Sequence, residues 1–316
     1  MKIAENKLSN GKVREQAAPL VDAKGILKSQ LLPDESLDSL WESIFIPPAQ
    51  KDQLLSQAVL NFTLRPKVDR AKVPLHGVIL LVGSPGTGKT SLARGLASRT
   101  ADSLKSSLGD FAYVEVEPHA LASSSLGRSQ KAVQELLGQT VSELAGQRPL
   151  IVLLDEVETL AANRTRMSLE ANPVDVHRAT DAVLAQLDHL AERHSKLLFI
   201  ATSNFPEAID QAFMSRADLI LTIDLPEEPA RKTIFKDTLE ELAKPFPKIT
   251  PLITDTNLEK LAKLSGGLDG RRIRKAVISA CAFDKHTALD INRLNMMDLE
   301  KAVSQAGQVN QRNGTK

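Results

Sequence analysis

A glycine-rich segment between an apolar run and a helical pattern constrains the fold of this chain more than any other feature. Residues 83–90 read Gly-Ser-Pro-Gly-Thr-Gly-Lys-Thr and directly follow the apolar run 78–82. Glycines let the backbone turn so closely that successive N–H groups point into one hollow, and the N-terminus of a following helix adds its own N–H groups. This pattern of strand, loop and helix is that of a phosphate-binding loop, or P-loop, so it predicts a nucleotide site.

Each position of the loop has an expected part in binding the nucleotide. Lys89 is expected to reach the β- and γ-phosphates of ATP, and the Thr90 hydroxyl is expected to bind Mg²⁺. The other residues expected to surround the phosphates are Gly83, Ser84, Pro85, Gly86, Thr87, Gly88 and Ser91. The sequence therefore predicts ATP and Mg²⁺ as the bound cofactors.

Short apolar runs alternate with helical patterns along the middle of the chain. Runs of strand length lie at 78–82, 113–116, 150–154, 197–202 and 220–223. Helical patterns lie between them at 133–144 and 179–190, and helical patterns alone follow at 230–242, 257–264, 271–283 and 297–306. Such alternation is typical of a parallel sheet covered by helices. We expect an α/β P-loop NTPase fold followed by a small all-helical lid domain.

The same patterns predict how the chain is divided. Residues 1–35 are polar and weakly patterned, so we expect a flexible N-terminal arm. The large α/β ATPase domain is expected over 36–226 and the helical lid domain over 227–307. The polar residues 308–316 are expected to form a disordered tail.

Composition argues against several classes of protein. The chain has 316 residues, which is enough for two domains. Forty basic and 39 acidic residues leave a net charge of +1, so no overall field attracts nucleic acid or a membrane surface. The N-terminus lacks the apolar core of a signal peptide, and no apolar stretch is long enough to span a bilayer. We expect a cytoplasmic protein without a membrane or nucleic-acid partner.

The apolar run 150–154 ends in two acidic residues, Asp155 and Glu156. Acids at the end of a buried strand are costly unless they have a cation to bind. Asp155 is expected to hold Mg²⁺, and Glu156 is expected to orient and polarise the water that attacks the γ-phosphate. The alternative is an ordinary strand that leads into a helix cap. The position of the pair downstream of a P-loop favours the hypothesis that both acids take part in metal binding and hydrolysis.

Asn204 and Arg216 are further candidates for contacts with the nucleotide. Asn204 follows the run 197–202 and is expected to place its amide between the P-loop and Asp155; alternatively it only turns the chain before a proline. Arg216 lies just before the last apolar run and is expected to reach the γ-phosphate of a neighbouring subunit. A surface ion pair with Asp218 is the alternative for Arg216.

Basic residues open a helical pattern in the predicted lid. Arg271 follows Gly-Gly-Leu-Asp-Gly and is expected to touch the nucleotide from the lid side. Arg272 and Arg274 are expected to face solvent or partners.

These features occur along the chain in the order seen in AAA+ ATPases, which this chain resembles: the P-loop, the acidic pair, Asn204, Arg216 and the glycine-rich Arg271 segment. Within that group, several segments resemble the pachytene-checkpoint/thyroid-receptor-interactor ATPases, namely 40–44, 155–160, 183–188, 202–204, 216–218 and 267–271. The resemblance covers residues 35–306. It implies a homo-hexameric ring that uses ATP to open HORMA-domain proteins and to release their closed, peptide-bound state.

The chain departs from the eukaryotic members of that family in two places. Only about 35 residues precede the segment around Trp41, whereas those members carry a sizeable N-terminal domain, so the chain resembles compact bacterial members. Such members resemble the regulators that are paired with HORMA proteins and nucleotidyltransferases in anti-phage signalling, so the resemblance implies these partners. The family's central pore loop usually has a bulky aromatic, but here Ser125 takes that place. The residues expected to contact substrate are Ser124, Ser125 and Leu126, with the loop 163–174 as a second pore candidate.

Two apolar residues are expected to form the adenine pocket with the P-loop strand. These are Ile44 and Phe45, and Trp41 before them is expected either to support that pocket or to lie in the core. Two other functions remain open from the sequence. A DNA-handling AAA+ ATPase of the clamp-loader or initiator type is one, and a nucleotide switch without hydrolysis is the other, although the intact acidic pair disfavours the switch.

Overall fold

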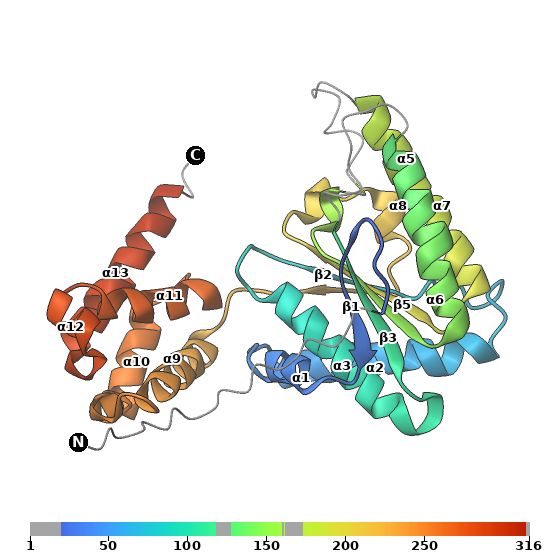
Figure 1. The fold of residues 1–316 in the computed structure, drawn as a ribbon. Helices are drawn as coiled ribbons and strands as arrows, with labels where there is room; N and C mark the ends of the chain where they lie inside the picture. Colours follow the sequence, from blue (N-terminus) through green and yellow to red (C-terminus); the bar gives the residue numbers. More distant parts are fainter. Residues whose placement is uncertain (1–19, 118–127, 160, 162–172, 314–316) are drawn as a thin grey trace, which may run out of the picture.

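The computed structural model describes residues 20–117, 128–159, 161 and 173–313. Two groups of elements are seen in Figure 1: a central sheet with helices on both faces, and a separate group of helices at the C-terminal end of the chain. We call these the α/β part (residues 20–225) and the helical group (α9–α13). Among the described residues, no helix is long and apolar enough to cross a membrane.

Six strands form one sheet in the order β1-β3-β4-β5-β2-β6. The strands are β1 (Ile26–Leu32), β2 (Val78–Val82), β3 (Phe111–Val116), β4 (Leu150–Leu154), β5 (Leu197–Ser203) and β6 (Leu219–Thr222). All neighbours are parallel except β1 and β3. The register pairs Val82 with Ser203 and Leu154 with Ala201, so the carboxyl ends of β2, β4 and β5 lie side by side. The loops that follow these three strands therefore meet at one edge of the sheet.

Both faces of the sheet are buried, which explains why its central strands read as continuous apolar runs. On β2, Ile79 and Leu81 join one hydrophobic cluster with residues of α1, α2 and α3, while Leu80 joins another with residues of α7 and α8. The helices around the sheet are α1 (Glu35–Glu42), α2 (Pro48–Leu64), α3 (Lys89–Leu108), α5 (Arg128–Val133), α6 (Ser142–Gln147), α7 (Pro173–Arg193) and α8 (Gln211–Met214), with a π-helical stretch (Gln134–Val141) between α5 and α6.

The helical group has a hydrophobic core of its own. Its helices are α9 (Glu228–Ala243), α10 (Asp255–Leu264), α11 (Gly270–Cys281), α12 (Lys285–Leu289) and α13 (Met296–Asn313). Fully buried side chains such as Phe235 and Val277 form this core, and Phe45 of the α/β part packs against it. Short 3₁₀ turns connect the elements at Arg65–Lys67, Val157–Thr159, Pro206–Ala208, Pro247–Leu252 and Ile291–Arg293.

The expected flexible arm over 1–35 is wrong for its second half. Strand β1 occupies residues 26–32 and pairs antiparallel with β3, so the sheet is mixed rather than purely parallel. Leu32 is fully buried in the core, and the Ser29 hydroxyl both donates to the Val21 carbonyl and accepts from its N–H. The strand forms because β3 offers an open edge of backbone groups. That edge is not visible in the local pattern of 26–32.

The expected disordered tail from residue 308 is also wrong over most of its length. Helix α13 continues to Asn313. Its buried side chains, Leu299, Ala302 and Val303, anchor the helix, and propagation adds one hydrogen bond per residue once a helix has formed.

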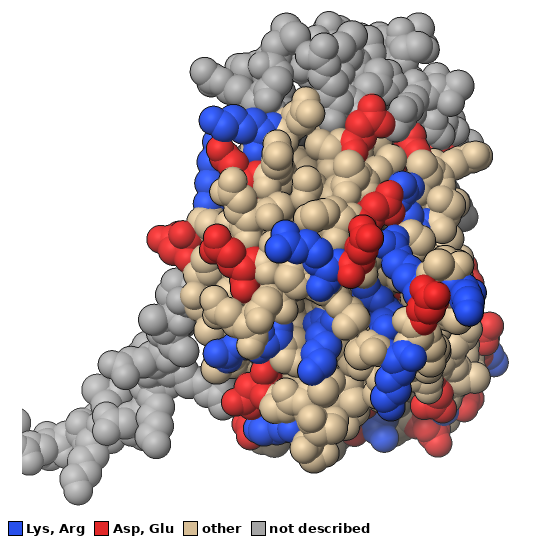
Figure 2. Space-filling view, turned by 90° about the vertical axis from the view of Figure 1, so that its right-hand side faces the viewer, with Lys and Arg blue, Asp and Glu red and all other residues tan. Residues whose placement is uncertain are grey.

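Charge is mixed on the face of the molecule drawn in Figure 2. Lys and Arg side chains gather over its lower half, with Asp and Glu side chains among them. This agrees with the near-zero net charge of the chain.

Candidate nucleotide site

Glycines at the P-loop occupy positions that other residues cannot take without strain. Gly86 and Gly88 have φ angles of 85° and 95°. A Cβ on Gly88 would lie 2.5 Å from the Ile44 Cδ1 atom, and one on Gly86 would lie 2.5 Å from an Asp269 carboxylate oxygen. Gly88 is also the N-cap of α3, and no side chain among the described residues caps that helix. Its first-turn N–H groups therefore suit a phosphate, which the dipole of the helix also favours.

Lys89 lies folded against its own loop. Its Nζ donates to the carbonyl oxygens of Gly83 at 2.8 Å and Ser84 at 2.9 Å. Burial lowers the pKa of the Lys89 ammonium, and the nearby carboxylates of Glu158 and Asp155 oppose that shift. Both loop carbonyls are single, neutral acceptors, so a triphosphate would be a stronger partner for this cation.

The acidic pair lies at the carboxyl end of β4, next to the P-loop helix. The Thr90 hydroxyl donates to Asp155 Oδ1 at 2.8 Å. Thr202, on β5, donates its hydroxyl to the same oxygen at 2.5 Å and accepts the N–H of Glu156 at 3.1 Å. Glu156 has a φ of 53°, a left-handed conformation that is rare outside glycine, and its side chain is exposed. Thr202 thus holds both acids, a role that its position in an apolar strand did not reveal.

Asn204 lies between the side chains of Glu156 and Glu158. Its Nδ2 donates to Glu156 Oε1 at 3.1 Å, and its backbone N–H donates to Glu158 Oε1 at 3.0 Å. The second oxygen of Glu158 is buried and has no hydrogen-bond partner among the described residues. Sequence reasoning placed Asn204 near Asp155 and assigned no role to Glu158; the structure instead pairs the amide with Glu156.

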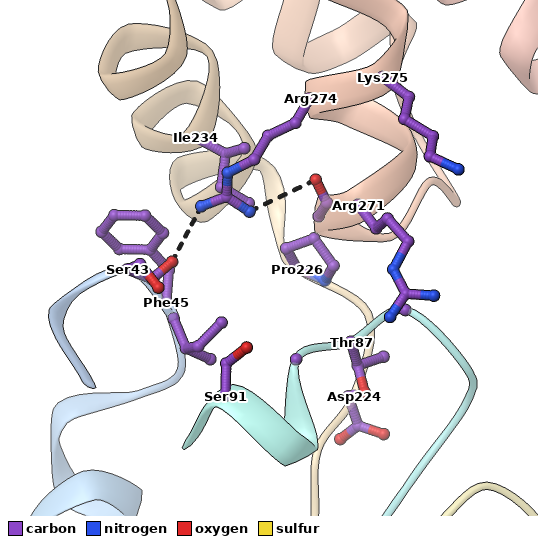
Figure 3. A pocket seen from close by; sticks show the side chains of 14 residues that line it. Ser43, Phe45, Thr87, Ser91, Asp224, Pro226, Ile234, Arg271, Arg274 and Lys275 are labelled. Atoms are coloured by element: carbon purple, nitrogen blue, oxygen red, sulfur yellow. Dashed lines mark hydrogen bonds between the residues drawn. The ribbon is translucent and has the colours of Figure 1, made fainter. Parts of the chain in front are cut away.

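A cavity of about 370 Å³ lies between the α/β part and the helical group. Residues predicted from the sequence line it: Ile44, Phe45, Gly86, Thr87, Gly88, Ser91 and Arg271. Residues that the sequence analysis did not predict for this site also line it: Ser43, Asp224, Pro226, Ile234, Gly270, Arg274 and Lys275. In Figure 3, Arg271 extends from α11 toward Thr87 of the P-loop. Trp41 is buried in the core next to α3 and does not line the cavity.

The expectation that Arg274 faces solvent is wrong. Its Nη2 donates to the Ser43 carbonyl at 3.0 Å, which joins α11 to the segment before α2 (Figure 3). Burial lowers the pKa of the Arg274 guanidinium. Because residues three or four apart share one face of a helix, Arg274 and Lys275 lie on the side of α11 that carries Arg271.

Arg216 does not form the predicted alternative ion pair with Asp218. Asp218 accepts the backbone N–H groups that open β2, including that of Gly77 at 2.6 Å. Arg216 instead pairs with Asp188 of α7, at 2.6 Å and 2.9 Å. Arg216 precedes β6, whereas the P-loop follows the parallel strand β2. Arg216 therefore lies at the amino ends of the strands, and the P-loop lies at their carboxyl ends.

Some predicted residues cannot be placed. Ser124, Ser125 and Leu126 lie outside the described residues, as does most of the second candidate pore loop, 163–174.

Comparisons with known proteins place this geometry in context. Residues 79–225 match the ATPase family associated with various cellular activities (AAA). The CD-NTase-associated protein 6 of Pseudomonas aeruginosa is 56% identical over 291 residues, which cover 92% of this chain and 95% of that protein. The pachytene checkpoint protein 2 homolog of Danio rerio is 32% identical over 301 residues, 88% of this chain and 70% of that protein.

A solved structure has a similar fold. It is a chain from the structure of the E. coli MS115-1 HORMA:CdnC:Trip13 complex, with a TM-score of 0.70 and 19% sequence identity. The match covers 88% of this chain and 94% of that one.

Proposed function

The chain belongs to the AAA ATPase family, among the relatives of CD-NTase-associated protein 6 and of the pachytene checkpoint protein 2 homologs, and from this premise we propose that it is an ATP-driven remodeller of HORMA-domain proteins. As a homo-hexamer it partly unfolds such a protein and disassembles the closed, peptide-bound complex. In this way it regulates anti-phage signalling by a nucleotidyltransferase. The observation that carries the proposal is the 56% identity to the P. aeruginosa protein over nearly the whole of both chains. The fold shared with a chain of a HORMA-containing complex supports it.

Oxygen ligands at the end of β4 suit magnesium. Thr90 and Asp155 present adjoining oxygens, and among the described residues no group of three or more His, Cys, Asp or Glu side chains forms a metal cage. Mg²⁺ is usually bound by one or two protein oxygens together with substrate phosphates. We assign the metal to Thr90 and Asp155. When bound, Mg²⁺ neutralises charge on the β- and γ-phosphates.

Several side chains of the chain then have defined parts in ATP hydrolysis. Lys89 leaves the two loop carbonyls for the phosphates, and Glu156 orients the attacking water. Asn204 holds the Glu156 carboxylate through the bond at 3.1 Å. Arg271 reaches the nucleotide from α11. Arg216 acts on the nucleotide of a neighbouring subunit, because in its own subunit it lies at the opposite edge of the sheet.

A ring of identical subunits fits such an arrangement. A contact in which one edge of a subunit meets the nucleotide edge of the next is heterologous, and heterologous contacts close into rings when the rotation allows it. ATP binds between the α/β part and the helical group, so hydrolysis changes how these two groups are held together. We propose that Ser124, Ser125 and Leu126 contact the substrate, as the family resemblance implies for the pore loop.

The proposal is tested by steady-state ATP hydrolysis, with and without a HORMA-domain protein from the same genome. We expect the HORMA protein to stimulate the wild type. We expect Glu156→Gln to bind ATP and retain the HORMA protein without turnover. Glu143→Gln changes an exposed carboxylate on α6 and is the matched control. Stimulation by DNA, and by no HORMA protein, would contradict the proposal and favour a DNA-handling AAA+ ATPase.

A further inference from the structure

Asp188 of α7 holds the guanidinium of Arg216 by two of its nitrogens. Arg216 Nε donates to Asp188 Oδ1 at 2.9 Å, and Nη2 donates to Oδ2 at 2.6 Å. The third nitrogen, Nη1, donates to the Ala212 carbonyl in α8 at 2.6 Å. Because a two-bond contact between arginine and carboxylate fixes the plane of the guanidinium, Arg216 has one defined orientation.

These bonds leave part of the guanidinium available. Arginine has five N–H donors, and the three bonds use one on each nitrogen. One N–H on each terminal nitrogen therefore has no partner among the described residues. Donors on a guanidinium form charge-assisted hydrogen bonds to phosphate oxygens. The Arg216 side chain is 20% exposed, so it is held in place and still accessible.

Asp188 is itself anchored from a second side. Its Oδ1 lies 3.5 Å from His76 Nε2 and 3.8 Å from Arg70 Nη2, and Arg70 also donates to the Asp188 carbonyl at 3.1 Å. Both residues belong to the segment that leads into β2. The hydrogen bond from Arg216, with smaller effects of the neighbouring His76 and Arg70, keeps the pKa of Asp188 below its ordinary value, although burial opposes the shift. Asp188 is therefore held by Arg216, between α8 and β6, on one side and by residues of the segment before β2 on the other.

We propose that Asp188 is a positioning residue for hydrolysis in the neighbouring subunit: it holds Arg216 so that the two remaining N–H groups point to that subunit's γ-phosphate. This rests on the proposed action of Arg216 across the subunit contact. An arginine in this role is worth about 10³- to 10⁵-fold in turnover, and a displacement of about 1 Å costs up to 10²-fold.

Turnover of Asp188 variants is the first test. We expect Asp188→Ala to lower kcat for ATP by about 10- to 100-fold with little change in KM, because Arg216 does not hold the ground-state nucleotide of its own subunit. Asp188→Asn keeps one acceptor oxygen and is expected to lie between Ala and wild type. Glu192→Gln alters an exposed carboxylate one turn further along α7 and should behave as wild type. A rise in kcat for Asp188→Ala would overturn the proposal, since it would mean that the ion pair with Asp188 keeps Arg216 away from the neighbouring nucleotide.

Mixed rings separate a positioning role from simple stabilisation of the subunit. Wild-type subunits are mixed with a large excess of Glu156→Gln subunits, so that each active site borrows its Arg216 from an inactive neighbour. Adding Asp188→Ala to the inactive subunits should lower turnover of the wild-type sites, whose own Asp188 is intact. Ring assembly, measured by light scattering, should not change.

Adding Arg216→Ala to the inactive subunits separates the positioning role of Asp188 from the action of Arg216 across the subunit contact. Loss with Arg216→Ala but none with Asp188→Ala would overturn the positioning role alone. No loss with either variant would overturn the action of Arg216 across the contact as well.

Discussion

At the scale of single residues, the site depends on a few side chains whose geometry is set by neighbours from other strands. Glu156 sits in a left-handed conformation at the end of β4, and Thr202 of β5 accepts its N–H. Asn204, one residue beyond β5, donates to its carboxylate. Because these partners lie on adjacent parallel strands, the direction of the Glu156 side chain depends on the register of the sheet.

Replacing Asn204 tests this dependence. Asn204→Ala removes the donor to Glu156, so we expect turnover of ATP to fall about 10- to 100-fold while nucleotide affinity stays near that of the wild type. Asn204→Asp places a second carboxylate beside Glu156 and should be more damaging than Ala. Gln147→Ala, an exposed change at the end of α6, is the control. Equal turnover in wild type and Asn204→Ala would show that the hydrogen bond plays no part in hydrolysis.

At the scale of elements, α11 connects the helical group to the cavity beside the P-loop. Its N-cap, Asp269, packs against Gly86 of the P-loop, and Arg274 bonds to the Ser43 carbonyl before α2. Arg271 and Lys275 line the cavity from the same helix. One helix therefore touches both the P-loop end of the cavity and the Ser43–Phe45 end.

Loss of the Arg274 contact should weaken nucleotide binding. In Arg274→Ala the segment 43–45 is no longer tied to α11, and we expect ADP affinity to fall about tenfold, in line with a hydrogen bond from a charged group. Arg274→Lys keeps the charge without the planar fork and should recover only part of the loss. Titration calorimetry measures both, with the exposed Lys263→Ala on α10 as the control. Unchanged affinity in Arg274→Ala would mean that the contact between α11 and Ser43 plays no part in nucleotide binding.

At the scale of the whole molecule, the α/β part and the helical group have separate hydrophobic cores. Two contacts join the groups: Phe45 packs against the helical core, and Arg274 of α11 donates to the Ser43 carbonyl of the α/β part. The cavity lies between the groups next to these contacts. The single tryptophan, Trp41, lies in the core of the α/β part. Its fluorescence therefore reports on one group, whereas circular dichroism reports on both.

Urea unfolding should reveal this division. Without nucleotide, we expect the Trp41 fluorescence transition and the circular dichroism transition to fall at different urea concentrations, which violates two-state behaviour. With ATP and Mg²⁺ on Glu156→Gln, the two transitions should move together and to higher urea, because we propose that the nucleotide contacts both groups. At a hundredfold excess over Kd the expected stabilisation is about 2.7 kcal/mol. Coincident transitions in the absence of nucleotide would mean that the two groups unfold as one unit.

Much of the nucleotide site follows from local sequence. The P-loop glycines are adjacent in the chain to the strand and helix that they join, and the acids end an apolar run, so short-range pattern is enough to predict both. The described strands at 78–82 and 150–154 confirm the pattern. The edge strand β1 was not predicted because its stability comes from pairing with β3, whose residues lie 79 to 90 positions further along the chain. The π-helical stretch 134–141 has the same apolar spacing as an α-helix and was not distinguishable from one.

The sequence by itself determined the P-loop fold and the family, because the strand, loop and helix of a P-loop are neighbours in the chain. Only the tertiary structure decided which partner each charged side chain takes. Arg274 bonds to a carbonyl 231 residues away, Asn204 to a carboxylate 48 residues away, and Arg216 to Asp188 rather than to the nearer Asp218. The physical reason is that a charge pairs with whatever the packed strands and helices bring within about 3 Å, and distance along the chain does not limit that choice.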